Sequence, residues 1–156
     1  MADSILLMNF SVTQFGQVLD PSKYTWDEST NTFSTNESNL VLDFLGIEGV
    51  TFKTGTDCTF NTSFGCTFNT SFGCNFNTGY NCTFKTGYGC NIGVYQNIKS
   101  IKCESDCIVI IRGLDKKYKK MTKKDAVLNI RSDDSIIRTM AYCKLNKIDF
   151  KCFREI

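Results

Sequence analysis

The chain of 156 residues contains no histidine, one proline and one tryptophan. Without histidine, a serine or cysteine nucleophile lacks its usual base. The sequence also shows no glycine-rich phosphate loop and no dinucleotide-binding fingerprint. Carboxylate pairs assembled by the fold stay open, because some β-helical enzymes cleave polysaccharides that way. We therefore expect a protein that is not an enzyme and that needs neither cofactor nor metal.

Long apolar runs are scarce as well. The opening residues, MADSILLMNF, have an acid at position 3, no basic region and only a short apolar stretch, so they match a signal peptide poorly. No segment reaches the length of a membrane span. We expect a protein of the cytoplasm, not secreted and not bound to membranes, whose nine cysteines are mostly reduced.

Aromatic residues are abundant, with thirteen phenylalanines and six tyrosines. Because aromatic residues and threonine suit pleated surfaces, this composition favours an all-β fold. Charge is unevenly distributed: residues 1–56 hold seven acids and two bases, 57–97 are neutral, and 98–156 hold eight acids and fifteen bases. Ends of opposite charge indicate a binding or stacking role, including pairing between copies as a homo-oligomer.

An eight-residue repeat occupies the middle of the chain. The units are VTFKTGTD (50–57), CTFNTSFG (58–65), CTFNTSFG (66–73), CNFNTGYN (74–81), CTFKTGYG (82–89) and a degenerate CNIGVYQN (90–97), with LDFLGIEG (42–49) as a lead-in. Sixth-place Ser or Gly and eighth-place Gly or Asn tolerate positive φ. Each unit is therefore predicted to be a short strand followed by a turn.

Each place in the repeat should keep its face of the sheet, because side chains alternate along a strand and eight is even. The outward threonines and asparagines should form a solvated surface with amide ladders. The first, third and fifth places, which hold cysteine, phenylalanine and the second threonine, should share the inner face. The predicted inner-face residues are Cys58, Phe60, Cys66, Phe68, Cys74, Phe76, Cys82, Phe84 and Cys90.

Three architectures can use such a unit: a flattened β-solenoid with two units per coil, a triangular one with three, or an antiparallel meander. Near-identical neighbours favour a solenoid, because stacked coils place like residues on like. The sequence leaves the choice between two and three units per coil open.

Cysteine at the head of each unit is best explained as a small apolar residue that fits a narrow inner corner. The alternatives are a disulfide ladder or a row of metal ligands. Zinc ligands have compact spacings, however, and an eight-residue period is not one. A second zinc hypothesis joins Cys103 and Cys107 to Cys143 and Cys152, whose spacings are also not standard.

Two flanking segments complete the predicted organisation: a cap over 1–41, the solenoid over 42–97, and a basic, strand-rich module over 98–156. Exposed strand edges need caps, and Tyr24 and Trp26 could cover the first coil. In the last module CIVIIR (107–112), AVLNI (126–130) and SIIRTMAY (135–142) look like strands. A short helix capped by Thr122 and Asp125 is the alternative, and Asp133 and Asp134 could be cap residues in a turn.

A lysine-rich segment is the main candidate for binding. It contains Lys116, Lys117, Tyr118, Lys119, Lys120, Lys123 and Lys124. Such a segment can meet an acidic protein surface or nucleic acid. It can also be a solvated hairpin whose lysines prevent aggregation. A protein partner is favoured over nucleic acid, since one tyrosine makes a thin stacking platform.

The repeat also resembles a known group. CTFxTG-type octads after a leader like YTWDESTNTFSTNESNLVLDF, followed by CIVIIR, are similar to phage-associated octapeptide-repeat proteins, most of which are uncharacterised. The resemblance covers roughly 24–112. It implies a β-helical repeat and a viral or mobile-element origin, and hence a place in the host cytoplasm or the virion. It supplies no catalytic residues.

The functional expectation is a non-enzymatic phage protein that acts through protein–protein contact, as a virion or assembly component or as an accessory protein against a host factor. One alternative is nucleic-acid binding through the 116–124 segment. Another is carbohydrate binding or cleavage along the aromatic repeat. The latter requires exposed rings at Phe64, Phe72, Tyr80 and Tyr88, whereas a purely structural repeat buries most of them.

Overall fold

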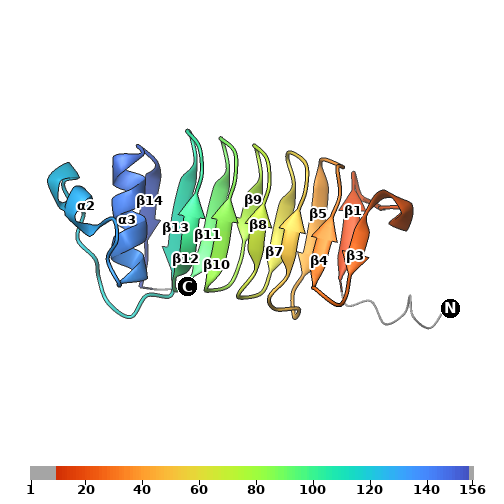
Figure 1. The fold of residues 1–156 in the computed structure, drawn as a ribbon, viewed down its shortest axis with the longest axis horizontal. Helices are drawn as coiled ribbons and strands as arrows, with labels where there is room; N and C mark the ends of the chain where they lie inside the picture. The colour runs from red at the N-terminus through yellow and green to blue at the C-terminus, as the bar shows by residue number, and fades with distance from the viewer. Residues whose placement is uncertain (1–9, 155–156) are drawn as a thin grey trace.

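The structure is a computed structural model that describes residues 10–154. Its strands stack into a flattened β-solenoid whose long axis follows the stack (Figure 1). Sheet A consists, in spatial order, of β14 (Asp149–Cys152), β13 (Ile108–Arg112), β11 (Asn91–Tyr95), β9 (Asn75–Asn77), β7 (Thr59–Thr62), β5 (Leu40–Phe44), β1 (Ser11–Gln14) and β2 (Gln17–Val18). Sheet B consists of β12 (Ile98–Lys102), β10 (Cys82–Lys85), β8 (Thr67–Asn69), β6 (Thr51–Lys53), β4 (Thr32–Ser34) and β3 (Thr25–Asp27). The predicted all-β solenoid is confirmed.

Strand register decides the size of the coil. Phe60 lies opposite Phe76 in sheet A, and Phe68 lies opposite Phe84 in sheet B, with both pairings parallel. Stacked residues are therefore sixteen positions apart, as in the bond between the side chains of Asn61 and Asn77. Each coil holds two repeat units, one per sheet, which excludes the triangular solenoid and the meander.

The interior is a double column of phenylalanine. In sheet B the ring centroids of Phe52 and Phe68 lie 5.2 Å apart, and those of Phe68 and Phe84 lie 5.1 Å apart. Rings of the two sheets meet edge to face, as Phe60 and Phe68 do at 5.1 Å. All nine residues expected on the inner face are buried. Each buried phenylalanine contributes about 1.5–3 kcal/mol of hydrophobic stabilisation, before the entropic cost of ordering it.

The corners use glycine for two different reasons. At the eighth place the backbone has positive φ, for example 70° at Gly65 and 59° at Asn81, so the predicted turn is present there. The sixth place does not have positive φ, and that part of the prediction was wrong. There a Cβ on Gly79 would lie 2.9 Å from the backbone nitrogen of Phe64, and one on Gly87 would lie 2.8 Å from that of Phe72. Glycine at the sixth place lets neighbouring coils approach closely.

The N-terminal end of the stack is closed by antiparallel strands. Strand β1 pairs with β2 and β5, and β3 pairs with β4. Phe10 stacks on Phe44 at 4.3 Å, and Trp26 and Tyr24 also pack against this cluster. Parallel stacking begins with β4 and β5 and continues through β13 and β14, so it extends beyond 42–97 on both sides.

The C-terminal module differs from the strand-rich prediction. The segments AVLNI and SIIRTMAY fall in α2 (Lys123–Asn129) and α3 (Ser135–Leu145), not in strands. The alternative helix is the one that forms: Thr122 Oγ1 accepts a hydrogen bond from the Asp125 nitrogen at 3.1 Å. Asp134 caps α3 in the same way, accepting from the Ile136 nitrogen at 2.9 Å. Within residues 10–154, neither helix has the length and apolar character that a membrane span requires.

Helix α3 also covers the exposed edge of sheet B. The Tyr142 hydroxyl accepts from the Cys103 nitrogen at 3.0 Å and donates to the Cys103 carbonyl at 3.1 Å. Arg138 donates to the Lys99 carbonyl at 3.1 Å. These side chains replace the hydrogen bonds that another strand would provide, and so they close the C-terminal end of the stack (Figure 1).

Candidate functional site

The cysteines are regularly spaced reactive groups, and burial limits the access of solvent to most of them. All nine are free; eight are buried and Cys152 is partly exposed. The thiols sit at the corners, near carbonyl groups: Cys66 Sγ is 3.8 Å from the Phe64 oxygen, and Cys82 Sγ is 3.7 Å from the Gly79 oxygen. Cysteine suits this position because it is small and apolar and can still donate a weak hydrogen bond.

Hydrogen bonds between stacked cysteines shift the pKa values of the two partners in opposite directions. A hydrogen bond with Cys82, together with burial, raises the pKa of Cys66 far above its ordinary value, whereas the same bond lowers the pKa of Cys82 to about 7. Burial raises the pKa of Cys143 to about 12. Across residues 10–154, no group of three or more His, Cys, Asp or Glu side chains is placed to hold a metal ion. The Cys103, Cys107, Cys143 and Cys152 set therefore does not assemble into a zinc site.

The outer face of sheet A carries the expected amide ladders. Asn77 Nδ2 donates to Asn61 Oδ1 at 3.2 Å, and Asn91 Nδ2 donates to Asn75 Oδ1 at 2.7 Å. Amides that bond to one another along the stack are less free to bind a ligand. This face is consequently a structural surface.

Aromatic residues at the seventh place form short ladders outside the corners. Tyr80 stacks on Phe64 at 4.8 Å and Tyr88 on Phe72 at 4.9 Å. The exposed fractions are 38% for Phe72, 36% for Tyr80 and 49% for Tyr88, so the expectation that a structural repeat buries most of them was wrong. Stacking nevertheless covers one face of each ring. Each ladder holds only two rings, which makes a short platform for a sugar to stack on.

The lysine-rich segment lies between β13 and α2, at the end of the molecule opposite the N-terminal cap (Figure 1). It forms a loop without paired strands, and therefore not the hairpin considered from sequence. All six lysines are exposed, and the last two begin α2. Tyr118 is half-buried: its hydroxyl donates to Asp134 Oδ2 at 3.3 Å, and Lys116 Nζ lies 5.0 Å from its ring centroid.

Two adjoining hollows flank this loop, and together we call them the C-terminal groove. One measures about 760 Å³ and is lined by Leu114, Lys116, Lys117 and Phe153 among others. The other measures about 590 Å³. Its apolar lining includes Met121, Met140, Ile148 and Phe150, and its charged lining includes Lys120, Lys144 and Lys151. The two hollows share Tyr118, Cys152 and Phe153.

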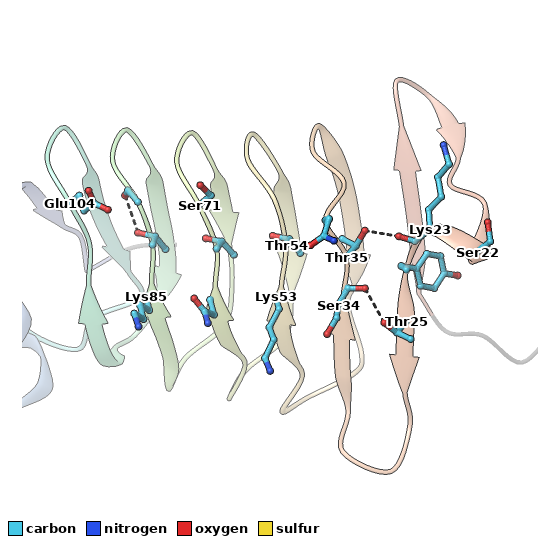
Figure 2. A pocket seen from close by; sticks show the side chains of 16 residues that line it. Ser22, Lys23, Thr25, Ser34, Thr35, Lys53, Thr54, Ser71, Lys85 and Glu104 are labelled. Carbon is cyan, nitrogen blue, oxygen red and sulfur yellow. Dashed lines mark hydrogen bonds between the residues drawn. The ribbon is translucent and has the colours of Figure 1, made fainter.

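A third hollow of about 750 Å³, the sheet B groove, runs over sheet B next to one row of corners. Figure 2 shows Lys53 and Lys85 extending from its strands, Lys23 at its N-terminal end and Glu104 at the other end. Strand register places Lys53, Asn69 and Lys85 in one row across β6, β8 and β10. Hydroxyl groups line most of the remainder: Ser22, Thr25, Ser34, Thr35, Thr54, Thr70, Ser71 and Thr86.

Comparison with protein-family models, with curated proteins and with solved structures gives no match.

Sequence reasoning missed the sheet B groove and the apolar floor of the C-terminal groove. The sequence does contain a sign of the sheet B groove. Lysine replaces asparagine at the fourth place only in units 50–57 and 82–89, which are an even number of units apart. That pattern acquires meaning only once the coil is known to hold two units. The second had no usable signal, because its apolar residues come from a loop, a helix and a strand that only the fold brings together.

Proposed function

We propose that this protein is a non-enzymatic binding protein whose C-terminal groove takes an acidic segment of a protein partner. The observation that supports this proposal is that the groove combines an apolar floor with lysines at its rim. Met121, Met140 and Phe150 line the floor, while Lys117 and Lys120 stand on the rim. Apolar side chains would anchor the partner, and the lysines would attract its carboxylates and set its orientation.

The composition of the groove favours a protein over nucleic acid. Nucleic-acid binding through exposed single strands needs aromatic faces on which bases can stack. Tyr118 is held by Asp134 and carries Lys116 against its ring, so its face is not free. Apolar side chains around Met140 offer little to a phosphate backbone and much to a leucine or phenylalanine of a partner.

Exposed apolar side chains beside the groove enlarge the surface. Val127 and Leu128 on α2 are 59% and 75% exposed, and Phe153 is 44% exposed with the Arg112 guanidinium 5.3 Å from its ring centroid. A surface that combines aromatic, arginine and aliphatic groups has the composition of a protein interface. The partner is accordingly expected to contact both the groove and α2.

The test is capture of partners from nuclease-treated host lysate by the wild-type protein and by two charge-reversed variants. Lys117→Glu/Lys120→Glu should abolish capture, while Lys53→Glu/Lys85→Glu, with the same change in net charge, should retain it. Met121→Gln should weaken capture at high salt, where apolar contacts dominate. Capture that survives both Lys117→Glu/Lys120→Glu and Met121→Gln would contradict the proposal, and capture found only in lysate without nuclease treatment would favour nucleic acid.

Two settings fit such a protein, in line with the resemblance to phage repeat proteins: a virion or assembly component, and an accessory protein that binds a host factor. They differ in self-association, for which the acidic and basic ends of the chain provide opposite charges. Light scattering coupled to size exclusion, under reducing conditions at low and high salt, separates them. A discrete homo-oligomer that persists in salt supports assembly, and a monomer supports the accessory role.

A further inference from the structure

The two outer faces of the solenoid differ in charge although the same repeat builds both. At the fourth place of the repeat, sheet A carries Asn61 and Asn77, which bond to each other. The same place in sheet B carries Lys53, Asn69 and Lys85. Lys102 continues this row on β12, in register with Lys85. Within the repeat the positive charge thus lies on sheet B, where it coincides with a hollow, whereas the corresponding row on sheet A reaches a lysine only at Lys151 of β14.

Strand geometry fixes the spacing of these charges. Adjacent strands lie about 4.8 Å apart, so the backbones of Lys53 and Lys85, two strands apart, are separated by about 10 Å. Both lysine side chains are exposed. The sheet beneath them is held by backbone pairing on both sides, so their spacing is set before any ligand arrives. A ligand with regularly repeated negative charges could pair with several of them at once.

The groove between the lysines is lined by hydroxyl groups. Thr54 Oγ1 and Thr70 Oγ1, like Thr62 Oγ1 on sheet A, are fifth-place hydroxyls that are buried and have no hydrogen-bond partner among the described residues, so they do not face a ligand in the groove. Others are occupied, such as Thr35 Oγ1, which donates to the Lys23 carbonyl at 2.7 Å (Figure 2). The exposed part of the lining therefore combines hydroxyl and amide groups with three lysines and one carboxylate, that of Glu104.

We infer that the sheet B groove binds an extended acidic polysaccharide, whose carboxylates pair with Lys53, Lys85 and Lys23 and whose hydroxyls bond to the accessible hydroxyls of the lining, those of Ser22, Thr25, Ser34 and Ser71. This site is separate from the C-terminal groove and from the aromatic ladders. Binding is expected to weaken with salt, because exposed ion pairs are screened.

Other chain-like anions fit the groove less well. Single-stranded nucleic acid needs stacking faces, and the one aromatic residue lining the groove, Tyr24, is packed against Phe10 and Phe33. An acidic peptide would bind by strand addition or by apolar anchors. Residues 51–53, 67–69 and 83–85 lie within paired strands and offer no open edge, and the lining has no apolar pocket.

The experiment measures fluorescence anisotropy with a labelled oligogalacturonate as the probe. Wild-type protein should bind it, and Lys53→Gln/Lys85→Gln should bind roughly tenfold more weakly. Lys117→Gln/Lys120→Gln, which removes two charges from the C-terminal groove, should bind like wild type. Equal losses in the two variants, or no loss in the first, would overturn the inference. Because the probe does not report on a protein partner, its failure leaves the proposed function standing.

A gain-of-charge variant tests whether the probe binds to any positively charged surface of the protein. Asn61→Lys/Asn77→Lys, made in the Lys53→Gln/Lys85→Gln background, restores the charge on sheet A. The inference expects binding to stay weak, because the hollow beside Asn61 and Asn77 is smaller, about 550 Å³, and is lined in part by Leu45, Phe64, Tyr80 and Tyr95. Recovery of binding would overturn it, as would equal affinity for a neutral dextran oligosaccharide, for labelled oligothymidylate or for oligoglutamate. All these substitutions lie on outer faces, and circular dichroism will verify the fold of each variant.

Discussion

The phenylalanine at the third place of the repeat packs in the core, whereas the aromatic residue at the seventh place lies outside a corner. Phe68 is fully buried and stacked between Phe52 and Phe84, whereas Phe72 sits outside a corner with 38% of its surface exposed. We expect Phe68→Ala to lower the free energy of unfolding by about 3–5 kcal/mol, because it leaves a cavity in the column. Phe72→Ala should cost about 1 kcal/mol, mainly through its lost stacking on Tyr88. Urea denaturation of both variants will measure the difference, and equal losses would contradict the packing described for the corners.

Thiol reactivity is predicted to differ between the buried cysteines and the partly exposed one. Eight are buried and Cys152 is partly exposed. In the folded protein at neutral pH, a thiol reagent should label Cys152 first, with the remaining eight protected until the chain unfolds. Mass spectrometry before and after addition of denaturant will count the labels. Rapid native labelling of cysteines within the repeat would show that the coils open readily.

At the level of elements, the junction between α3 and sheet B rests on few contacts. The Tyr142 hydroxyl makes two hydrogen bonds with the backbone of Cys103. Tyr142→Phe should therefore lower the free energy of unfolding by about 1–3 kcal/mol, since it leaves edge groups of sheet B without partners. Tyr88→Phe, at an exposed corner, is the matched control and should change it by less than about 0.5 kcal/mol. Thermal denaturation will compare them; equal shifts would show that α3 is not needed to close this edge.

The same elements show what the sequence could and could not predict. CIVIIR was recognised as a strand because it is a short apolar run with β-branched residues, and it forms β13. SIIRTMAY has a similar composition, but Ile136, Met140 and Cys143 recur at helical spacing and are buried, while Asp134 caps the helix. Apolar content alone cannot separate the two states. The cap residue Asp134, together with the helical spacing of the apolar residues, is the feature of the sequence that indicates α3.

The candidate sites were predictable to different degrees. The lysine-rich segment stands out in composition, so its exposure followed directly from the sequence. Its apolar floor did not, because Met121, Met140 and Phe150 are far apart in the chain and meet only through tertiary packing. For the repeat, alternation of faces predicted which residues lie inside. The number of units per coil depends on how the corners pack, which local propensity does not determine.

At the scale of the whole molecule, the protein can be lengthened or shortened without moving strands between sheets only by whole coils of two repeat units. Deletion of residues 66–81 removes one full coil and lets β10 pair with β6 and β11 with β7 in the same registers. We expect this variant to fold and to melt cooperatively at a somewhat lower temperature. Deletion of 66–73 removes a single unit and moves every later strand to the opposite sheet. Helix α3 keeps its contacts with β12 and β14, which move together, but β10 would then have to pair with β7 instead of β8. This exchange of sheets at the junction should lower the melting temperature more than loss of a full coil does. Size exclusion and circular dichroism will compare the two, and a half-coil deletion as stable as the full-coil deletion would contradict this expectation.

This restriction also limits how the number of repeat units can change in the gene. The two CTFNTSFG units are identical, and stretches of coding sequence that resemble each other so closely are prone to misalign when they are copied. A slip of one unit would yield a chain whose later strands lie in the opposite sheet, while a slip of two units would yield a longer or shorter protein in which every strand keeps its sheet. Selection would then remove variants that have gained or lost an odd number of units. Natural length variants of such a repeat would therefore differ by even numbers of units.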